Sequence, residues 1–330
     1  MRMKLRILLG CFALAMGLRA ADTPARALLV LEKAQNSLVI VDPEEMAIVA
    51  RVPAGNDPHE VAVSDDGKIA YVSNYGGGAT GYNTISVIDL VAQKPLPPID
   101  LGELRGPHGL AFSGGKLYFS AESTNVAARY DPATHKIDWT KPTGQDRTHM
   151  VLVSKDRKTV FTSNVRSSSI SIITQAAGRG SAEWTVTNVP VGHGSEGFDL
   201  TPDGKELWVA NAQDGTISII DVAARKVIDT IPSTKAANRL KITPNGKYVF
   251  VSDMSGPNLL VINAATHKEF TRIVLPASSE GLLVQPDSRR AYATLNTNDS
   301  VAVIDLSTMT MIDEIKTGKG PDGLAWAARR

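Results

Sequence analysis

Three of the six histidines in the chain begin the same short pattern, in which a polar residue precedes a run typical of a β-strand. The pattern occurs seven times, and no residue at this position is apolar. In order along the chain, the seven residues are His59, His108, His149, Glu196, Asn238, Glu280 and Asp322. Chance would place on the order of 0.1 histidines in seven chosen positions, so the enrichment indicates a shared role. Neutral imidazoles bind divalent metal ions and also transfer protons, and the three histidines are candidates for both kinds of chemistry.

The spacing of these seven residues predicts the elements that position them. Neighbouring members lie 41 to 49 residues apart, which is about the length of a four-stranded propeller blade. In the fifth repeat, β-rich runs at residues 197–200, 206–210, 216–221 and 227–231 alternate with turn residues such as Pro202-Asp203-Gly204. Helical periodicity is absent. The sequence therefore predicts an all-β protein, a seven-bladed β-propeller.

The two ends of the chain predict how the ring closes. Residues 27–31 have the pattern of a second strand, and residues 323–327 have the pattern of an inner strand that has no blade of its own. The C-terminal strand should therefore complete the first blade and leave no open sheet edge. A propeller of this size counts as one domain, which we place at residues 21–330.

Residues 1–20 have the features of a secretory signal peptide. Arg2, Lys4 and Arg6 precede an apolar run at residues 7–18, and small residues follow before Asp22. We therefore expect a periplasmic or secreted protein with no transmembrane segment in the mature chain, because no later apolar run is long enough. The only cysteine, Cys11, lies in the signal peptide, which excludes disulfides and thiolate metal ligands from the mature chain.

Charge and composition narrow the range of partners. The formal net charge is +1 and no run of like charge occurs, so the chain lacks the basic footprint of a nucleic-acid-binding protein. We expect a monomer that binds a small molecule or a metal ion. An envelope protein is a further candidate partner.

A family resemblance rests on the second and third strands of the repeats. Tyr71-Val72-Ser73-Asn74 followed by Ile85-Ser86-Val87-Ile88-Asp89 resembles the YVTN family of β-propeller repeats, and the resemblance extends over nearly all of the mature chain. It implies the propeller fold. It leaves function open, because that family includes lactonase-like propellers, periplasmic and surface-layer proteins, and the propeller domains of haem and copper reductases. The chain has no Cys-x-x-Cys-His motif for covalent attachment of haem.

The seven polar residues begin the inner strands, so they should lie near one mouth of the central channel. Two interpretations of this ring remain open. In the first, the channel is simply polar and filled with water. In the second, His59, His108 and His149 converge on a divalent metal such as Zn, Cu, Fe or Ni, with Asp322 as a further ligand, or they line a pocket for a small molecule.

Catalysis is a further possibility at the same mouth. A metal with an open coordination position would acidify a bound water, which could attack an ester or lactone carbonyl. Glu196 or Glu280 could act as the general base, and Arg239, next to the ring, could hold a substrate carboxylate. No serine-hydrolase elbow or dinucleotide fingerprint is present.

These observations lead to one function hypothesis with two alternatives. The hypothesis is an exported propeller that binds a metal ion or a small ligand and has a binding or accessory role in the cell envelope. The first alternative is a metal-dependent, lactonase-like hydrolase or lyase at the same site. The second is a protein-interaction scaffold without a metal.

A second ring of mostly polar residues is predicted at the ends of the second strands, on the same face. Its members are Glu32, Asn74, Glu122, Asn164, Asn211, Asp253 and Leu295. We interpret them as groups that satisfy loop backbone atoms. A glycine-rich insertion at residues 75–83 lies on this face and is interpreted as a flexible loop.

Overall fold

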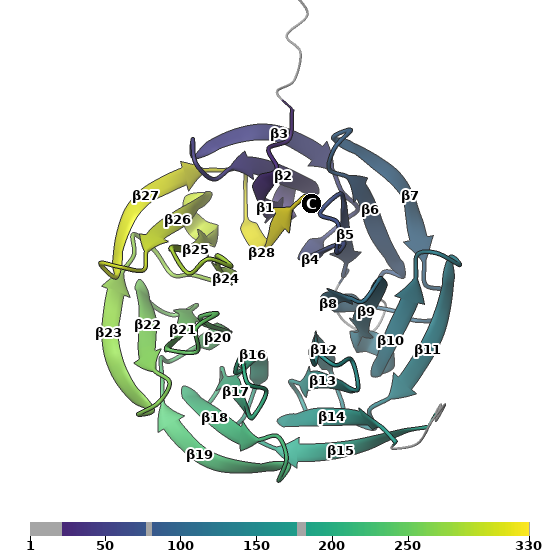
Figure 1. Ribbon diagram of the computed structural model, residues 1–330, viewed down its shortest axis with the longest axis vertical. Coiled ribbons are helices and arrows are strands. Elements are labelled where there is room, and N and C mark those ends of the chain that lie inside the picture. Colours follow the sequence, from purple (N-terminus) through teal and green to yellow (C-terminus); the bar gives the residue numbers. More distant parts are fainter. Residues whose placement is uncertain (1–21, 77–80, 177–182, 330) are drawn as a thin grey trace, which may run out of the picture.

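The computed structural model describes residues 22–76, 81–176 and 183–329, which form seven four-stranded antiparallel sheets around a central axis (Figure 1). The prediction of an all-β, seven-bladed propeller is confirmed. The predicted signal peptide, residues 1–20, and part of the glycine-rich insertion, residues 77–80, lie outside the described residues. In the part of the chain that is described, helix is limited to three short 3₁₀ turns, and none could cross a membrane.

Each blade runs from an inner strand at the channel to an outer strand at the rim. From inner to outer, the strands of the first four blades are β28 (Pro321–Ala328), β1 (Arg26–Glu32), β2 (Ser37–Asp42) and β3 (Ala47–Pro53); β4 (Pro58–Val63), β5 (Ile69–Asn74), β6 (Thr84–Asp89) and β7 (Lys94–Asp100); β8 (Pro107–Ser113), β9 (Lys116–Ala121), β10 (Val126–Asp131) and β11 (Lys136–Pro142); β12 (Thr148–Val153), β13 (Thr159–Asn164), β14 (Ser169–Gln175) and β15 (Trp184–Pro190).

The remaining three blades follow the same order. Their strands are β16 (Ser195–Leu200), β17 (Glu206–Asn211), β18 (Thr216–Asp221) and β19 (Lys226–Pro232); β20 (Ala237–Ile242), β21 (Tyr248–Asp253), β22 (Asn258–Asn263) and β23 (Lys268–Val274); β24 (Leu282–Val284), β25 (Arg290–Leu295), β26 (Ser300–Asp305) and β27 (Thr310–Lys316). The 3₁₀ turns are η1 (Lys33–Gln35), η2 (Glu122–Thr124) and η3 (Asn296–Asn298).

The apolar core lies between the faces of neighbouring blades. The second and third strands are buried on both faces because each sheet packs against one sheet on either side. Between the fifth and sixth blades, for example, Trp208 and Ile219 pack in one cluster with Val249 and Leu260. Each such fully buried side chain stabilises the fold by about 1.5–3 kcal/mol. The outer strands alternate between exposed and half-buried residues, as expected for strands with one face toward solvent.

The ring closes through its two chain ends, as the sequence predicts. β28 pairs antiparallel with β1, with Trp326 opposite Leu28 and Leu324 opposite Val30. Ala327 of β28 is buried in the same core cluster as Leu29 of β1. This pairing covers the inner edge of β1 and closes the ring of blades.

A β-bulge at the start of the inner strands brings two consecutive side chains toward the axis. In β4, Pro58 pairs with Asn74 and Val61 pairs with Val72, so that His59 and Glu60 together face one residue of β5. The same shift occurs in β8, β12, β16, β20 and β28. Bulges of this kind commonly redirect side chains near functional sites. The second bulged N–H is satisfied by a hydroxyl of the neighbouring strand, as in Glu60 N to Ser73 Oγ at 3.0 Å.

Glycine at the second bulged position lets neighbouring inner strands approach closely. A Cβ atom on Gly323 would lie 2.3 Å from the carbonyl oxygen of His59, which no side chain tolerates. Only three blades carry a larger residue at this position. These residues are Glu60, Met150 and Arg239.

Removal of residues 321–330 deletes β28, and we expect the shortened protein to lose its cooperative unfolding transition. The physical reason is that β1 becomes an open edge and the apolar side chains of the first blade lose one of their covers. Thermal unfolding followed by circular dichroism measures this, with a protein that lacks only Arg330 as the control. A transition as sharp and as high in temperature as that of the control would contradict the closure.

Candidate functional site

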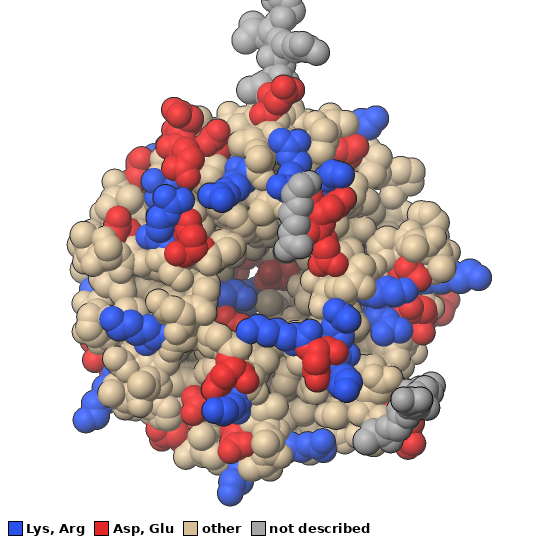
Figure 2. Space-filling view, viewed as in Figure 1, with Lys and Arg blue, Asp and Glu red and all other residues tan. Residues whose placement is uncertain are grey.

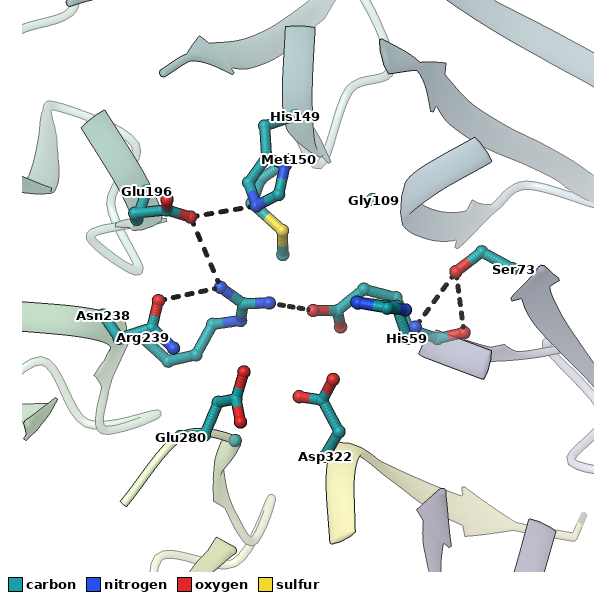
Figure 3. Close-up of polar contacts among 12 residues, drawn as sticks. His59, Ser73, Gly109, His149, Met150, Glu196, Asn238, Arg239, Glu280 and Asp322 are labelled. Carbon is teal, nitrogen blue, oxygen red and sulfur yellow. Dashed lines mark hydrogen bonds and ion pairs between the residues drawn. The ribbon is translucent and has the colours of Figure 1, made fainter. Parts of the chain in front are cut away.

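The structure brings the predicted ring residues together at one end of the channel (Figure 3). The three imidazoles are adjacent, because the ring centroid of His108 lies 3.7 Å from that of His149 and 5.2 Å from that of His59. All three histidines are buried, as are Asn238 and Asp322. Glu196 and Glu280 are partly exposed.

His149 lies between two carboxylates. Its Nδ1 atom is 2.5 Å from Glu122 Oε2, and its Nε2 atom is 2.9 Å from Glu196 Oε2. An imidazole that meets a carboxylate at each nitrogen donates from both, and so carries a positive charge. Although burial opposes the charged form, the carboxylates of Glu196 and Glu122 raise the pKa of His149 above 6.5. Glu122 also accepts hydrogen bonds from the Tyr75 hydroxyl and from Arg147 Nε, the latter at 3.2 Å.

The other two histidines are neutral. Burial, with a contribution from Lys33, lowers the pKa of His59 to about 4. Burial, together with the positive charge of His149, lowers the pKa of His108 well below 6.5. The Nδ1 atom of His108 is buried and has no hydrogen-bond partner among the described residues. The mouth therefore holds one charged imidazole beside two uncharged ones.

A metal centre is not assembled from these side chains as they lie. The described residues contain no group of three or more His, Cys, Asp or Glu side chains arranged to hold a metal ion. Both nitrogens of His149 are engaged by carboxylates, and one contact would have to be released before this residue could bind a metal. Asp322, the predicted further ligand, is under the electrostatic influence of Glu280, Arg239 and Lys33. The metal hypothesis stays a prediction.

The guanidinium of Arg239 reaches across the channel. Its Nη2 donates to Glu60 Oε1 at 2.6 Å, which joins the sixth blade to the second, and its Nη1 lies 3.3 Å from Asn238 Oδ1 and 3.9 Å from Glu196 Oε2 (Figure 3). Arg239 is thus already paired with carboxylates of the protein itself. A substrate carboxylate would have to compete with them.

Two carboxyl groups near Arg239 differ in protonation at neutral pH, because one is largely protonated and the other is negatively charged. Burial, and next the charge of Glu280, raises the pKa of Asp322 to about 8, so that this carboxyl is largely protonated. For Glu196, burial is outweighed by the positive charges of His149 and Arg239, and its pKa falls to about 2. At that pKa, and with His149 hydrogen-bonded to it, Glu196 is a weak general base at neutral pH.

A cavity of about 110 Å³ lies in the channel next to this layer of polar residues. Its charged lining residues are Glu60, Arg239 and Lys241, and glycines and apolar residues of the inner strands, including Leu110, Met150 and Leu240, form the rest. Figure 2 shows the hollow at the centre of the ring, with acidic and basic side chains in its depth. The space holds several water molecules or a small ligand.

The predicted second ring is wrong at Glu122. Pro107 pairs with Ala121, so Glu122 lies one residue beyond the position that Asn74 occupies in its own blade. This offset is what brings Glu122 to His149. The asparagines of the ring hydrogen-bond mainly to hydroxyl groups of their own blades, as in Asn74 Nδ2 to Thr84 Oγ1 at 2.8 Å, more than to loop backbone.

Five residues of the site were not identified from the sequence as site residues. They are Lys33, Glu60, Tyr75, Glu122 and Arg147. If the β-bulge had been recognised as part of the repeat, Glu60 would have been identified, because Glu60 occupies the position of Arg239 in its own blade. Tyr75 was assigned to the flexible insertion. No pattern in the sequence links Glu122 or Arg147 to His149.

Comparison with known proteins supports the fold and leaves the function open. The family model of the YNCE-like β-propellers matches residues 116–290, more than half of the chain. No curated protein matches the sequence.

Solved structures share the whole fold at low sequence identity. A functionally unknown protein from Desulfotomaculum acetoxidans aligns with a TM-score of 0.77 at 12% identity, over 92% of this chain and 99% of that one. The periplasmic gluconolactonase of Pseudomonas aeruginosa aligns with a TM-score of 0.73 at 14% identity, again over 92% and 99%. The hydrazine synthase of Kuenenia stuttgartiensis aligns with a TM-score of 0.71 at 19% identity, over 89% and 99%. At these identities the likeness shows the fold alone.

Replacement of His149 by glutamine should lower the free energy of unfolding by roughly 3 kcal/mol near pH 6, because it removes a buried positive charge between Glu122 and Glu196. Since the folded pKa of His149 is raised above 6.5, its contribution is complete below that pH and is lost as the pH rises through the folded value. Since the pKa of Glu196 is lowered from 4.5 to about 2, its contribution is present above 4.5 and is lost as the pH falls toward 2.

The measurement is urea unfolding of the wild type and H149Q at pH 5.5 and at pH 9. The difference between the two proteins should be larger at pH 5.5. His193→Gln is the control, because that imidazole is exposed and pairs only with Asp214 on the surface. A difference that grows toward pH 9 would contradict the charged state of His149.

Proposed function

The chain belongs to the YNCE-like β-propeller family, and we propose that it is an exported member that binds a small polar ligand in its central channel, against Arg239 and Glu60. The observation that supports this most directly is a cavity of about 110 Å³ in the channel, together with buried polar atoms at the same mouth that have no hydrogen-bond partner among the described residues. These atoms belong to His108, Asn238 and Asp322. An unpaired buried polar group costs about 1–3 kcal/mol, and such groups in a native structure commonly mark a place that a ligand or water completes.

The groups at this site are held rigidly, which favours binding. Arg239 is fixed by Glu60 and Asn238, and it projects from a β-strand rather than from a loop. Rigid placement lowers the entropy that binding would otherwise cost. The lining offers a donor in the Arg239 guanidinium and an acceptor in the Glu60 carboxylate, which suits a molecule with hydroxyl, carbonyl or amine groups. The role that we propose is that of a binding or accessory protein of the cell envelope, in the periplasm or outside the cell.

Hydrolysis of a lactone is the second candidate, and two pKa values favour it. His59, with a pKa of about 4, is a free base at neutral pH, and Asp322, with a pKa of about 8, is an acid. A base and an acid with separated pKa values can activate water and protonate a leaving alcohol. The likeness of the fold to a gluconolactonase is compatible with this chemistry. Asp322 is therefore the candidate general acid, and His59 replaces Glu196 as the candidate general base.

Binding is tested with the mature protein against a panel of sugars, sugar acids, sugar lactones and small amines. We expect at least one class to shift the methyl resonance of Met150, which lines the cavity, and Arg239→Gln to weaken that ligand about tenfold. Arg272→Gln is the control, because Arg272 lies on the outer strand β23 and pairs with Glu269. If no member of the panel moves the Met150 signal in the wild type, the channel is not the binding site.

Lactone hydrolysis is tested by following acid release from the same lactones. If the second candidate is right, kcat should be highest between about pH 4 and 8, since it needs His59 unprotonated and Asp322 protonated. His59→Gln and Asp322→Asn should each lower kcat at least tenfold, which corresponds to an activation free energy higher by about 1.4 kcal/mol or more.

The metal hypothesis is tested by elemental analysis of the protein purified without a histidine tag. A variant with His59, His108 and His149 replaced by alanine is measured beside it. About one metal per chain, lost in that variant, would assign any turnover to a metal centre.

A further inference from the structure

Carboxyl groups are concentrated around one guanidinium at the centre of the mouth. Arg239 is under the influence of four carboxyl groups, those of Glu60, Asp322, Glu196 and Glu280. Glu60 binds Arg239 directly, whereas Glu196 is shared between Arg239 and His149.

The other two carboxyl groups have little compensation. In the part of the chain that is described, the side chain of Glu280 accepts a hydrogen bond only from Asn296 Nδ2, at 3.2 Å. Asp322 accepts none. On the side of the mouth formed by the first, second and seventh blades, the carboxyl oxygens of Glu280 and Asp322 thus meet few donors among the described residues.

The state of Asp322 independently indicates that a hydrogen-bond donor is missing on this side of the mouth. It is only 1% exposed, and both of its carboxyl oxygens lack a hydrogen-bond partner among the described residues. Its side chain points toward the space that Glu280 and Arg239 also face (Figure 3). The only ion pair that it makes is with Lys33 Nζ at 3.7 Å, which is too long for a hydrogen bond. A carboxyl group left in this state costs free energy unless a donor completes it.

The cavity reaches this side of the mouth. Its lining includes Glu60, and also Gly281 and Gly323, which directly follow Glu280 and Asp322 in the chain. Glu280 and Asp322 are thus adjacent in the chain to the cavity lining, and both side chains are turned toward the space that Arg239 faces (Figure 3).

We propose that Glu60, Glu280 and Asp322 form a site for a cationic group of the ligand, a protonated amine. This deepens the proposed function and rests on it. An ammonium group has three N–H donors and one positive charge, which matches three carboxyl acceptors beside an already paired guanidinium. An anionic ligand would meet four carboxyl groups, and a neutral one would bring no positive charge to them. Because Asp322 is largely protonated at neutral pH, a cation that binds beside it lowers the pKa of this carboxyl and displaces its proton.

Lys33 has a particular part in this site. It lies in η1, its side chain is 31% exposed, and its ammonium, 3.7 Å from Asp322 Oδ2, is the nearest cation to that carboxyl among the described residues. An exposed, flexible lysine can move away at small cost. Lys33 therefore competes with the amine of a ligand for the same carboxyl group, and its removal should strengthen binding.

The probe is ethylammonium, titrated into the full mature chain at pH 7 and followed by the Met150 methyl resonance and by calorimetry. We expect Asp322→Asn and Glu280→Gln each to weaken its binding about tenfold, and Lys33→Met to strengthen it a few-fold. Glu269→Gln on the outer strand β23 is the matched control for loss of a carboxylate, because that residue is exposed. Lys33→Met also guards against variants that merely fail to fold, because a misfolded protein would not gain affinity.

Four further probes are titrated in the same way: propanol, acetate, potassium ions and calcium ions. They distinguish an amine site from a site for a neutral molecule, an anion or a metal ion. If propanol or acetate binds in the channel and ethylammonium does not, the amine site is refuted and the proposed function stands. If calcium or potassium binds and ethylammonium does not, a metal ion takes the place of the amine and the proposal is likewise refuted. An unchanged or lower affinity in K33M would also overturn it. If neither these probes nor the wider panel moves the Met150 signal, the proposed function fails with it.

Discussion

The pairing of β28 with β1 is the constraint on which the rest of the structure depends. Seven sheets can surround a common axis only if the last one is joined to the first, and here the two ends of the chain share one sheet. The closed ring fixes the distance of every inner strand from the axis. Residues of opposite blades can then meet across the channel, as Arg239 and Glu60 do at 2.6 Å.

Within that ring, the bulge at the start of the inner strands determines how crowded the axis becomes. Glycine in four blades keeps neighbouring strands close, and Glu60, Met150 and Arg239 fill the space that remains. So many ionisable groups are stable in a buried place because most are paired: Glu122 with His149, His149 with Glu196, and Arg239 with Glu60. Asp322, His59 and His108 stay largely uncharged instead.

The uneven distribution of charge gives the mouth two chemically different sides. Blades two to four contribute imidazoles and Tyr75, which packs edge-on against His59 and His108. Blades six, seven and one contribute Arg239 and the carboxyl groups of Glu280 and Asp322. Proteins that share this fold carry out unrelated tasks, so the fold does not assign a function. Whatever this chain does must follow from the residues that it alone places at the axis.

The sequence by itself determined the blade number, the turns, the order of strands and the closure. All of these depend on local patterns, such as the Pro-Asp-Gly turn at 202–204 and the repeat of the inner-strand residues, and local patterns are preserved along the chain. It also placed His59, His108 and His149 at one mouth. Only the tertiary structure decided how they interact. The partners of His149 come from different blades, and Glu122 reaches it from the position directly after the end of β9. Glu60 and Arg239 meet although 179 residues separate them, because the ring brings opposite blades together at the axis. The repeat pattern of the sequence does not show which side chains are long enough to touch across the channel.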